Sequence, residues 1–185
     1  MLRCSDRPWK DASETNLLGL PSESSRMSAC LPERLPHPII EIRQILAGHY
    51  RRLSARSRAL RFLSPIREPG IEKLASAANP EFVLAVEIDG LNRAILEAFR
   101  LSSTHAEIGL SVEDPFQGHG YGSRLLMAGI SEARKAGFES LSLFFSSQNK
   151  ATLKLCRAWK ATFEREGGCL VAHISLSRAS SIESS

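Results

Sequence analysis

The feature that most constrains the fold of this chain is a glycine-rich turn between a strand and a helix. Residues 106–112 alternate apolar and other side chains with the period of a strand. Residues 117–122 then read Gln-Gly-His-Gly-Tyr-Gly, and apolar residues continue at helical spacing up to Gly137. The first turn of such a helix has unpaired N–H groups and a partial positive charge, and glycine lets an anion approach closely. The segment is therefore either a phosphate-binding site or a tight turn that binds nothing.

Three kinds of phosphate-binding loop use such glycines, and the spacing separates them. A Walker loop requires Gly-x-x-x-x-Gly-Lys before its Ser or Thr, and no lysine follows the glycines here. In a dinucleotide-binding loop, Gly-x-Gly-x-x-Gly, the third glycine falls where this chain has Ser123. A methyltransferase loop also reads Gly-x-Gly-x-Gly, but it normally lies in the first strand–helix unit. Here the loop lies in the second half of the chain, so the glycines alone give that reading little support.

The remaining periodicity predicts a single mixed domain. Helical spacing begins at Ile39, Ser54, Gly70 and Asn149, in addition to the helix after the glycine loop. Strands are expected over residues 82–88, 93–101, 106–112, 139–146, 162–166 and 169–176, the first three as an antiparallel meander. The fold class is therefore α/β or α+β, with a mixed and mostly antiparallel sheet. Residues 1–33 are rich in Ser, Pro and charge and predict a disordered leader, 34–177 the domain, and 178–185 a disordered tail.

Composition narrows the class of protein. The chain is 43% hydrophobic and 24% charged, and no apolar run approaches the roughly 18–20 residues that a membrane span needs. No secretory signal is seen, and the four cysteines have no metal-binding spacing, so a cytoplasmic location and no metal site are expected. The net charge of +4 is weak evidence for a polyanionic partner. The basic run between Arg51 and Arg61 lacks interleaved aromatic residues, so nucleic acid is not expected as a partner.

Three segments together resemble the GNAT superfamily of N-acetyltransferases. The family pattern is a strand ending in a hydrophobic residue, a short spacer, then Gln or Arg-Gly-x-Gly-x-Gly or Ala, and residues 112–122 reproduce it. A second family pattern, Asn-x-x-Ala-x-x-Leu, is matched at Asn149 and Leu155, with Thr152 in place of Ala. Residues 54–62 look like the Ser-x-x-Ser-x-x-x-Arg-Phe element of domains similar to bacterial protein-lysine acetyltransferases.

The resemblance implies a splayed sheet that holds acetyl-coenzyme A (acetyl-CoA). The pantetheine arm is expected on backbone groups of Leu110 and Val112, and Asn149 either bonds this arm or caps its own helix. The pyrophosphate is expected on the amides of the loop, at Gln117, Gly118, His119, Gly120, Gly122 and Ser123. No metal is implied. The acetyl acceptor, a small amine or a protein lysine, is expected on the opposite side, and the protein is expected to be a monomer or homodimer.

The resemblance also implies that Glu107 is the general base; the residues alone equally allow a solvated charge on the outer face of its strand. A lysine amine has an ordinary pKa of about 10.4, so only about 0.1% is neutral near pH 7.4, and a carboxylate that takes the proton favours attack. Alternation places Glu107, Gly109 and Ser111 on one face of their strand, and we expect Gly109 to keep that face open.

Two departures from the family pattern leave a second reading open. Cys156 stands where a Tyr general acid is common, and residues 160–163 (Lys-Ala-Thr-Phe) replace the expected Gly-Phe. The favoured function is transfer of an acetyl group from acetyl-CoA to a primary amine. The alternative is a non-catalytic acyl-CoA-binding regulatory module.

Overall fold

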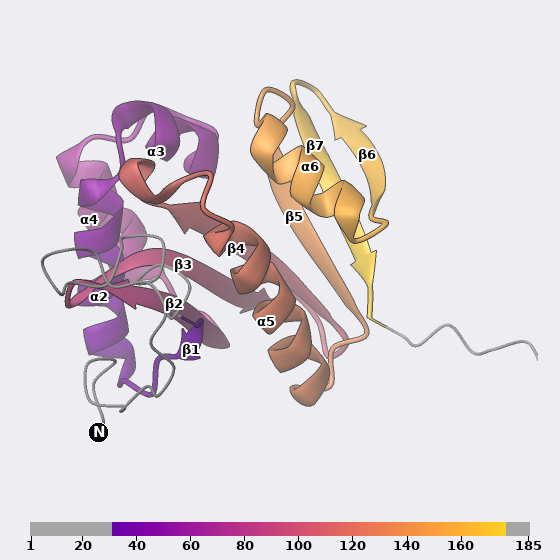
Figure 1. The fold of residues 1–185 in the computed structure, drawn as a ribbon, viewed down its shortest axis with the longest axis horizontal. Coiled ribbons are helices and arrows are strands. Elements are labelled where there is room, and N and C mark those ends of the chain that lie inside the picture. Colours follow the sequence, from indigo (N-terminus) through magenta and orange to yellow (C-terminus); the bar gives the residue numbers. More distant parts are fainter. Residues whose placement is uncertain (1–30, 177–185) are drawn as a thin grey trace, which may run out of the picture.

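The computed structural model describes residues 31–176, which form one seven-stranded sheet with helices on both faces (Figure 1). The strands are β1 (Glu33–Arg34), β2 (Phe82–Ile88), β3 (Leu91–Arg100), β4 (His105–Val112), β5 (Ser140–Ser146), β6 (Thr162–Glu166) and β7 (Cys169–Ser175). The helices are α2 (Ile39–Arg52), α3 (Ala55–Phe62), α4 (Glu68–Ala77), α5 (Tyr121–Lys135) and α6 (Lys150–Ala158), with a 3₁₀ turn, η1, at Asp114–Phe116. The sheet order is β1-β2-β3-β4-β5-β7-β6.

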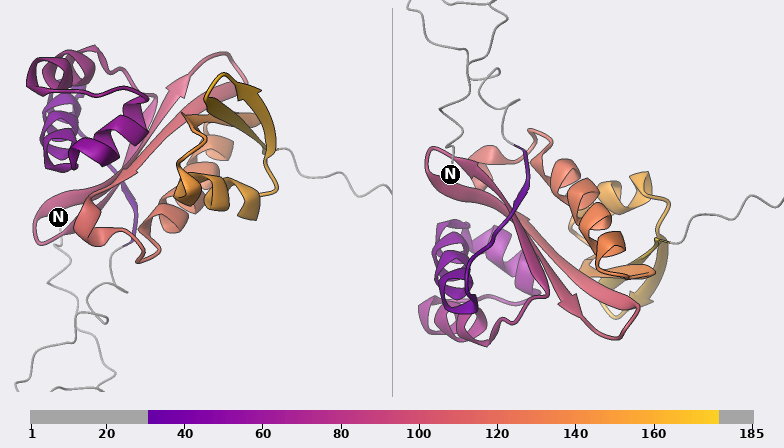
Figure 2. Two further views of the ribbon diagram at one scale, coloured as in Figure 1. Left: turned by 90° about the horizontal axis from the view of Figure 1, so that it is seen from above. Right: turned by 90° about the horizontal axis from the view of Figure 1, so that it is seen from below.

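The first half of the sheet is a meander buried on both faces. Asp89 and Gly90 turn β2 into β3 with φ angles of 52° and 73°, the left-handed conformation of a tight hairpin turn. Alternate residues of β2 then enter two separate apolar cores, Phe82 and Leu84 on the side of α5, and Val83 on the side of α2 and α4. Figure 2 shows these two helical layers on opposite sides of the twisted strands.

The sheet opens in its middle, between β4 and β5. These neighbours are parallel, whereas every other pair of adjacent strands is antiparallel. Their register covers three pairs, from His105 with Ser140 to Glu107 with Ser142, and both strands continue beyond the last pair. The two halves of the sheet therefore diverge toward the top of Figure 1, with α3 on one side of the opening and α6 on the other.

The predicted fold class is confirmed, with a few differences in element boundaries. Helix α4 begins at Glu68 rather than Gly70, and β3 begins at Leu91 rather than Arg93. Strand β1 was not expected, and Glu33, the last residue of the expected leader, lies in it and pairs with Ala85. The rest of the expected leader up to residue 30, and the expected tail at 178–185, lie outside the described residues. Within residues 31–176 no helix is both long and apolar enough to cross a membrane.

Candidate active site

The glycine loop leaves a row of backbone donors without partners. Gly118 and Gly120 have φ angles of 79° and 83°, which ordinary side chains rarely adopt, and Gly120 is the N-cap of α5. Within residues 31–176, the N–H groups of Gly118, Gly120, Gly122 and Ser123 have no hydrogen-bond acceptor. A Cβ atom placed on Gly118 or Gly120 would meet nothing within 4 Å. The loop thus offers open N–H groups at the positive end of a 15-residue helix, which is the geometry of an anion site.

Gln117 contributes to this loop in a different way from the glycines. Its backbone N–H donates to the Asp114 carbonyl at 3.2 Å and is therefore already used. Its side-chain amide donates to Ser57 Oγ at 3.2 Å and to the Val112 carbonyl at 3.0 Å. Gln117 thus joins the loop to α3 and to the end of β4. The His119 ring is exposed beside the loop, and its role in the expected site is limited to its backbone.

The opening between the strands exposes peptide groups of β4. Glu113 N–H donates to the Arg93 carbonyl of β3 at 2.9 Å. Successive residues of a strand direct their peptide groups to opposite sides, so Val112 and Leu110 direct theirs away from β3. Both residues lie beyond the last β4–β5 pair at Glu107. Their peptide groups therefore face the opening as an unpaired strand edge, although the Val112 carbonyl already accepts from Gln117.

Glu107 lies at the point where β4 and β5 separate. It is half-buried and forms the last register pair with Ser142 of β5. The alternation expected for this strand is observed, since Ala106 and Ile108 enter the core beneath α5 while Ser111 faces α2, where its hydroxyl bonds His49 Nε2 at 2.9 Å. The carboxylate of Glu107 is therefore on the face opposite α5, the side on which α3 lies.

The expectation that Gly109 keeps this face open is wrong. Gly109 is buried, and a Cβ placed on it would overlap the guanidinium of Arg61 from α3. Arg61 Nη2 donates to Glu97 Oε1 at 3.2 Å, and Tyr50 donates its hydroxyl proton to Glu97 Oε2 at 2.7 Å. The glycine therefore provides room for an arginine. The negative charges of Glu97 and Glu107 both act on Arg61.

The Tyr50–Glu97–Arg61 cluster is buried between α2, α3 and β3. Glu97 is 1% exposed and Tyr50 2%. Burial disfavours charge on Arg61, but Glu97 and neighbouring groups outweigh this effect and raise the pKa of Arg61. Burial and the charge of Glu97 likewise raise the pKa of Tyr50. The sequence analysis did not single out Glu97 or Tyr50. A carboxylate within the apolar strand segment 94–98 requires a hydrogen-bonding or charged partner, so Glu97 alone indicated that such a cluster exists.

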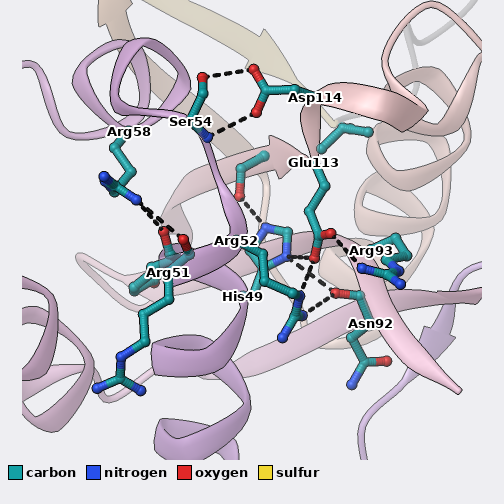
Figure 3. A network of polar contacts seen from close by, with 12 residues as sticks. His49, Arg51, Arg52, Ser54, Arg58, Asn92, Arg93, Glu113 and Asp114 are labelled. Carbon is teal, nitrogen blue, oxygen red and sulfur yellow. Dashed lines mark hydrogen bonds and ion pairs between the residues drawn. The ribbon is translucent and has the colours of Figure 1, made fainter.

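A second buried carboxylate, Glu113, holds the start of the loop (Figure 3). Arg52 Nε donates to Glu113 Oε1 at 2.6 Å and Arg93 Nη1 to Oε2 at 2.9 Å, while His49 Nδ1 lies 3.4 Å from Oε1. His49 Nδ1 also lies 3.1 Å from the carbonyl of Asn92, so both of its neighbours are acceptors and Nδ1 carries a proton. Burial alone would raise the pKa of Glu113, but the hydrogen bonds from His49, Arg52 and Arg93 outweigh it and lower this pKa to about 2.

The upstream Ser-x-x-Ser element binds α3 to Asp114, the residue that follows Glu113. Asp114 accepts hydrogen bonds from the backbone N–H and the hydroxyl of Ser54, at 2.9 and 2.7 Å (Figure 3). It also accepts from the hydroxyl of Ser57 at 2.8 Å. The Ser54 hydroxyl also accepts from Ser57 N–H as the N-cap of α3. These bonds lower the pKa of Asp114 although burial opposes the shift. The element that resembles the protein-lysine acetyltransferases is thus a set of contacts to β4 and its loop.

The basic run does not form a continuous solvated face. Arg51 forms ion pairs with two glutamates of α4, and Arg58 donates to three carbonyls at the end of α2. Arg56 is exposed and lines a cleft of about 350 Å³ between α3 and the far half of the sheet. The residues around this cleft are otherwise neutral: Ala59, Leu60, Leu63, Ser146, Gln148, Gly168 and Cys169.

The structure places the two remaining candidates at α6. Asn149 Oδ1 accepts from Thr152 N–H at 3.1 Å and caps the helix, while its side-chain amide stays available as a donor. Cys156 is completely buried in the core beneath α6, and burial raises the pKa of its thiol to about 11. Such a thiol is a packing residue and a poor proton donor. No group of three or more His, Cys, Asp or Glu side chains within residues 31–176 could hold a metal ion.

The fold of this chain is similar to that of several solved acetyltransferase structures. The GNAT domain of S. lividans PAT matches with a TM-score of 0.65 and 20% identity over 78% of this chain and 89% of that one. YncA, a putative acetyltransferase from Salmonella typhimurium solved with acetyl-CoA, matches with a TM-score of 0.56 and 17% identity over 80% and 95%. The PaiA N-acetyltransferase from Thermoplasma acidophilum, solved with coenzyme A, gives 0.58 and 16% over 78% and 98%.

The sequence itself places the chain in a family. The profile of the Acetyltransferase (GNAT) family matches residues 49–159, which is more than half of the chain. Comparison with curated proteins gives no significant match. The chain therefore belongs to the GNAT family of acetyl-CoA-dependent N-acetyltransferases, as the glycine loop predicted.

Proposed function

We propose that this chain transfers the acetyl group of acetyl-CoA to a primary amine, with Glu107 as the general base. One observation carries the proposal: Glu107 is the last residue of β4 that pairs with β5, and the unpaired edge of Leu110 and Val112 follows it along the same strand. Pantetheine has amide groups that can pair with this edge. The pyrophosphate would lie on the free N–H groups of Gly118, Gly120, Gly122 and Ser123. The Asn149 amide would bond the pantetheine arm from the other side of the opening.

The reaction assigned to the site requires one proton transfer from the amine. The amine nitrogen attacks the thioester carbonyl carbon, the carbon–sulfur bond breaks, and the sulfur leaves as coenzyme A thiolate. Glu107 accepts the proton lost from nitrogen, directly or through one water, as the new carbon–nitrogen bond forms. The thiolate takes its proton from solvent, since the buried Cys156 thiol has a pKa of about 11 and holds its own proton too tightly to give it up.

The acceptor is a small amine or a protein lysine that reaches Glu107 from the α3 side. The cleft there has one free cation, Arg56, and no acidic residue among those that line it. A polyamine would find no carboxylate for its second ammonium group, whereas an amine next to a carboxylate would meet Arg56. These residues favour acceptors with an acidic neighbour.

A panel of acceptors tests this proposal. Thiol release from acetyl-CoA would be measured with amino acids, polyamines, an aminoglycoside, and lysine peptides with acidic or basic flanks. Turnover with at least one amine is expected, and acidic neighbours should lower KM. Calorimetry with acetyl-CoA, coenzyme A and S-adenosylmethionine serves as the binding control. Tight acetyl-CoA binding without turnover on any amine would instead favour a non-catalytic acyl-CoA-binding module, the alternative that Cys156 at the usual Tyr position motivates.

A further inference from the structure

Helix α3 runs in the opposite direction to β4, and this gives the cleft beside it a direction. Ser54, at the start of the helix, bonds Asp114, which follows the end of β4. Arg61, in the last turn of the helix, lies over Gly109 in the middle of β4. The path along α3 from its first turn to its last therefore leads back along β4 in the direction of Glu107.

The opposite wall of the cleft has the same direction. Ser146 lines the cleft, and Ser142 is the residue of β5 that pairs with Glu107. The two serines lie on one face of β5 and are four residues apart, so roughly 13 Å of strand separates them. Cys169 of β7 pairs with Ser146 and lines the cleft beside it. An acceptor held in the cleft must therefore extend along the strand to bring its amine to Glu107.

The side chains of α3 that line the cleft change from charged to apolar along this path. Arg56 in the first turn is exposed and forms no hydrogen bond or ion pair with any residue of 31–176. Leu60 and Leu63 follow one and two turns later, and the rise from Arg56 to Leu63 is about 10 Å. Side chains lean toward the N-terminus of their helix, which places the guanidinium farther still from Glu107. An apolar wall thus lies between the cation and the candidate base.

The backbone of Leu63 is unusual for a leucine. Leu63 is the C-cap of α3, with a φ of 59° and a ψ of 13°, a left-handed conformation in which glycine is the ordinary residue. A side chain in this conformation is strained, and strain that persists at a candidate site is a reason to look for a role. Glycine would relieve the strain, but it would remove this part of the apolar wall. The leucine side chain is therefore placed in the cleft despite an unfavourable backbone.

We propose that the cleft selects an ω-amino acid, in which an extended apolar chain separates the amine from the carboxylate. The carboxylate pairs with Arg56, the chain packs on Leu60 and Leu63, and the amine reaches Glu107. The inference rests on the proposed function, since it takes the acetyl acceptor to enter from the α3 side. An α-amino acid does not meet both ends of the cleft, because its amine and carboxylate are attached to the same carbon atom.

Chain length tests this selection directly. Thiol release would be measured with β-alanine, γ-aminobutyrate, ε-aminocaproate and ω-aminocaprylate, each compared with the alkylamine of the same chain length, which lacks the carboxylate. The ratio of kcat/KM for the amino acid to that for the alkylamine should rise with chain length. It should reach about tenfold or more once the chain spans the cleft. A ratio that is equal at every length, or highest for β-alanine, would overturn the proposal.

Matched variants assign the effect to two side chains. Arg56→Met should lower the ratio for ε-aminocaproate to about one, whereas Arg165→Met, which removes the same charge from β6, should leave it unchanged. Leu63→Asn removes the apolar side chain and keeps the backbone, since Asn adopts the left-handed conformation readily. It should raise KM for ε-aminocaproate several-fold. Lys160 has a φ of 55° and is exposed, so Lys160→Asn is its control. Unchanged values in Arg56→Met or Leu63→Asn would overturn the assignment.

Binding of the product separates a failure of this inference from a failure of the proposed function. N-acetyl-ε-aminocaproate keeps the carboxylate and the chain, and calorimetry in the presence of coenzyme A gives its Kd without any turnover. The Kd should rise about tenfold in Arg56→Met and stay unchanged in Arg165→Met. If this difference is found and no amine is acetylated, the proposed function fails and the cleft assignment stands. Absence of binding to the wild type, or an equal Kd in both variants, would overturn the cleft assignment itself.

Discussion

Asp114 accepts hydrogen bonds from both the backbone N–H and the hydroxyl of Ser54, at 2.9 and 2.7 Å. Ser54 is the N-cap of α3, and Asp114 is the first residue of the turn η1 that leads into the glycine loop. The helix that lines the candidate acceptor cleft and the loop expected to hold the cofactor are therefore fastened to each other. A displacement of one element is transmitted to the other through these short bonds.

Asp114→Ala should loosen the start of α3. The variant loses the acceptor of three hydrogen bonds, so the free energy of unfolding should fall by about 1–2 kcal/mol. Amide hydrogen exchange should increase most at the first turn of α3, where Ser57 N–H bonds the Ser54 hydroxyl. Glu166→Ala, at the exposed β6–β7 turn, is the control. Equal protection of α3 in the wild type and in Asp114→Ala would show that the helix is held by its apolar contacts alone.

Gly120→Val should abolish acetyl-CoA binding, because its side chain would occupy the space in front of the loop amides. The substitution also strains the backbone by about 1–2 kcal/mol, since φ is 83°. Gly137 has the same φ of 83° and equally open surroundings at the other end of α5, so Gly137→Val is a control for strain. Calorimetry should show lost affinity only for the Gly120 variant, with similar melting temperatures for both. Wild-type affinity in a folded Gly120→Val protein would place the pyrophosphate elsewhere.

Glu107→Gln should lower kcat by roughly 10²-fold or more at neutral pH with little change in acetyl-CoA affinity. The substitution keeps the shape of the side chain and removes its basicity. The defect should shrink as pH rises, because a neutral amine needs no base. Glu87→Gln, an exposed carboxylate on β2, is the matched control. Unchanged turnover of Glu107→Gln between about pH 6 and 9 would mean that another group or bulk water takes the proton.

Glu113→Gln should cost stability in a pH-dependent manner. The folded pKa of about 2 lies below the ordinary value of 4.5, so ionised Glu113 stabilises the fold above the unfolded value. This contribution is lost as the pH falls from about 5 toward 2. The variant should therefore be less stable than the wild type at pH 7, by about 3 kcal/mol, and the difference should narrow at pH 3. Urea unfolding at both pH values measures it, and a constant difference would show that Glu113 acts by packing rather than by charge.

The sequence predicted those parts of the site that depend on local pattern. The strand alternation placed Glu107 and Ser111 on the same face, and the glycine spacing placed a tight glycine-rich turn at the start of α5. Strand β1 could not be predicted, since two residues have no period and pair only because the edge of β2 is available. The role of Gly109 was misread because the guanidinium above it comes from α3, and a contact 48 residues away in sequence leaves no local trace.

The partners of the buried carboxylates likewise could not be predicted from the sequence. Glu113 is contacted by side chains of α2 and β3, and only the packed fold brings His49, Arg52 and Arg93 to one carboxylate. A signal for one such cluster was present at Glu97, a single charge in an apolar strand. Its partners could not be chosen from sequence, because five arginines between residues 51 and 61 were equally suitable.

The three residue pairs between β4 and β5 are the whole backbone ladder that joins the two halves of the described sheet. We call these three pairs the seam. The seam and the apolar core under α5 together hold the two halves of the sheet in position. Ala106 and Leu141 lie in the seam and are fully buried, whereas Phe145 lies beyond it on one half only. A destabilising substitution at Ala106 or Leu141 would therefore alter the angle between the halves. A substitution at Phe145 would destabilise one half and leave that angle intact.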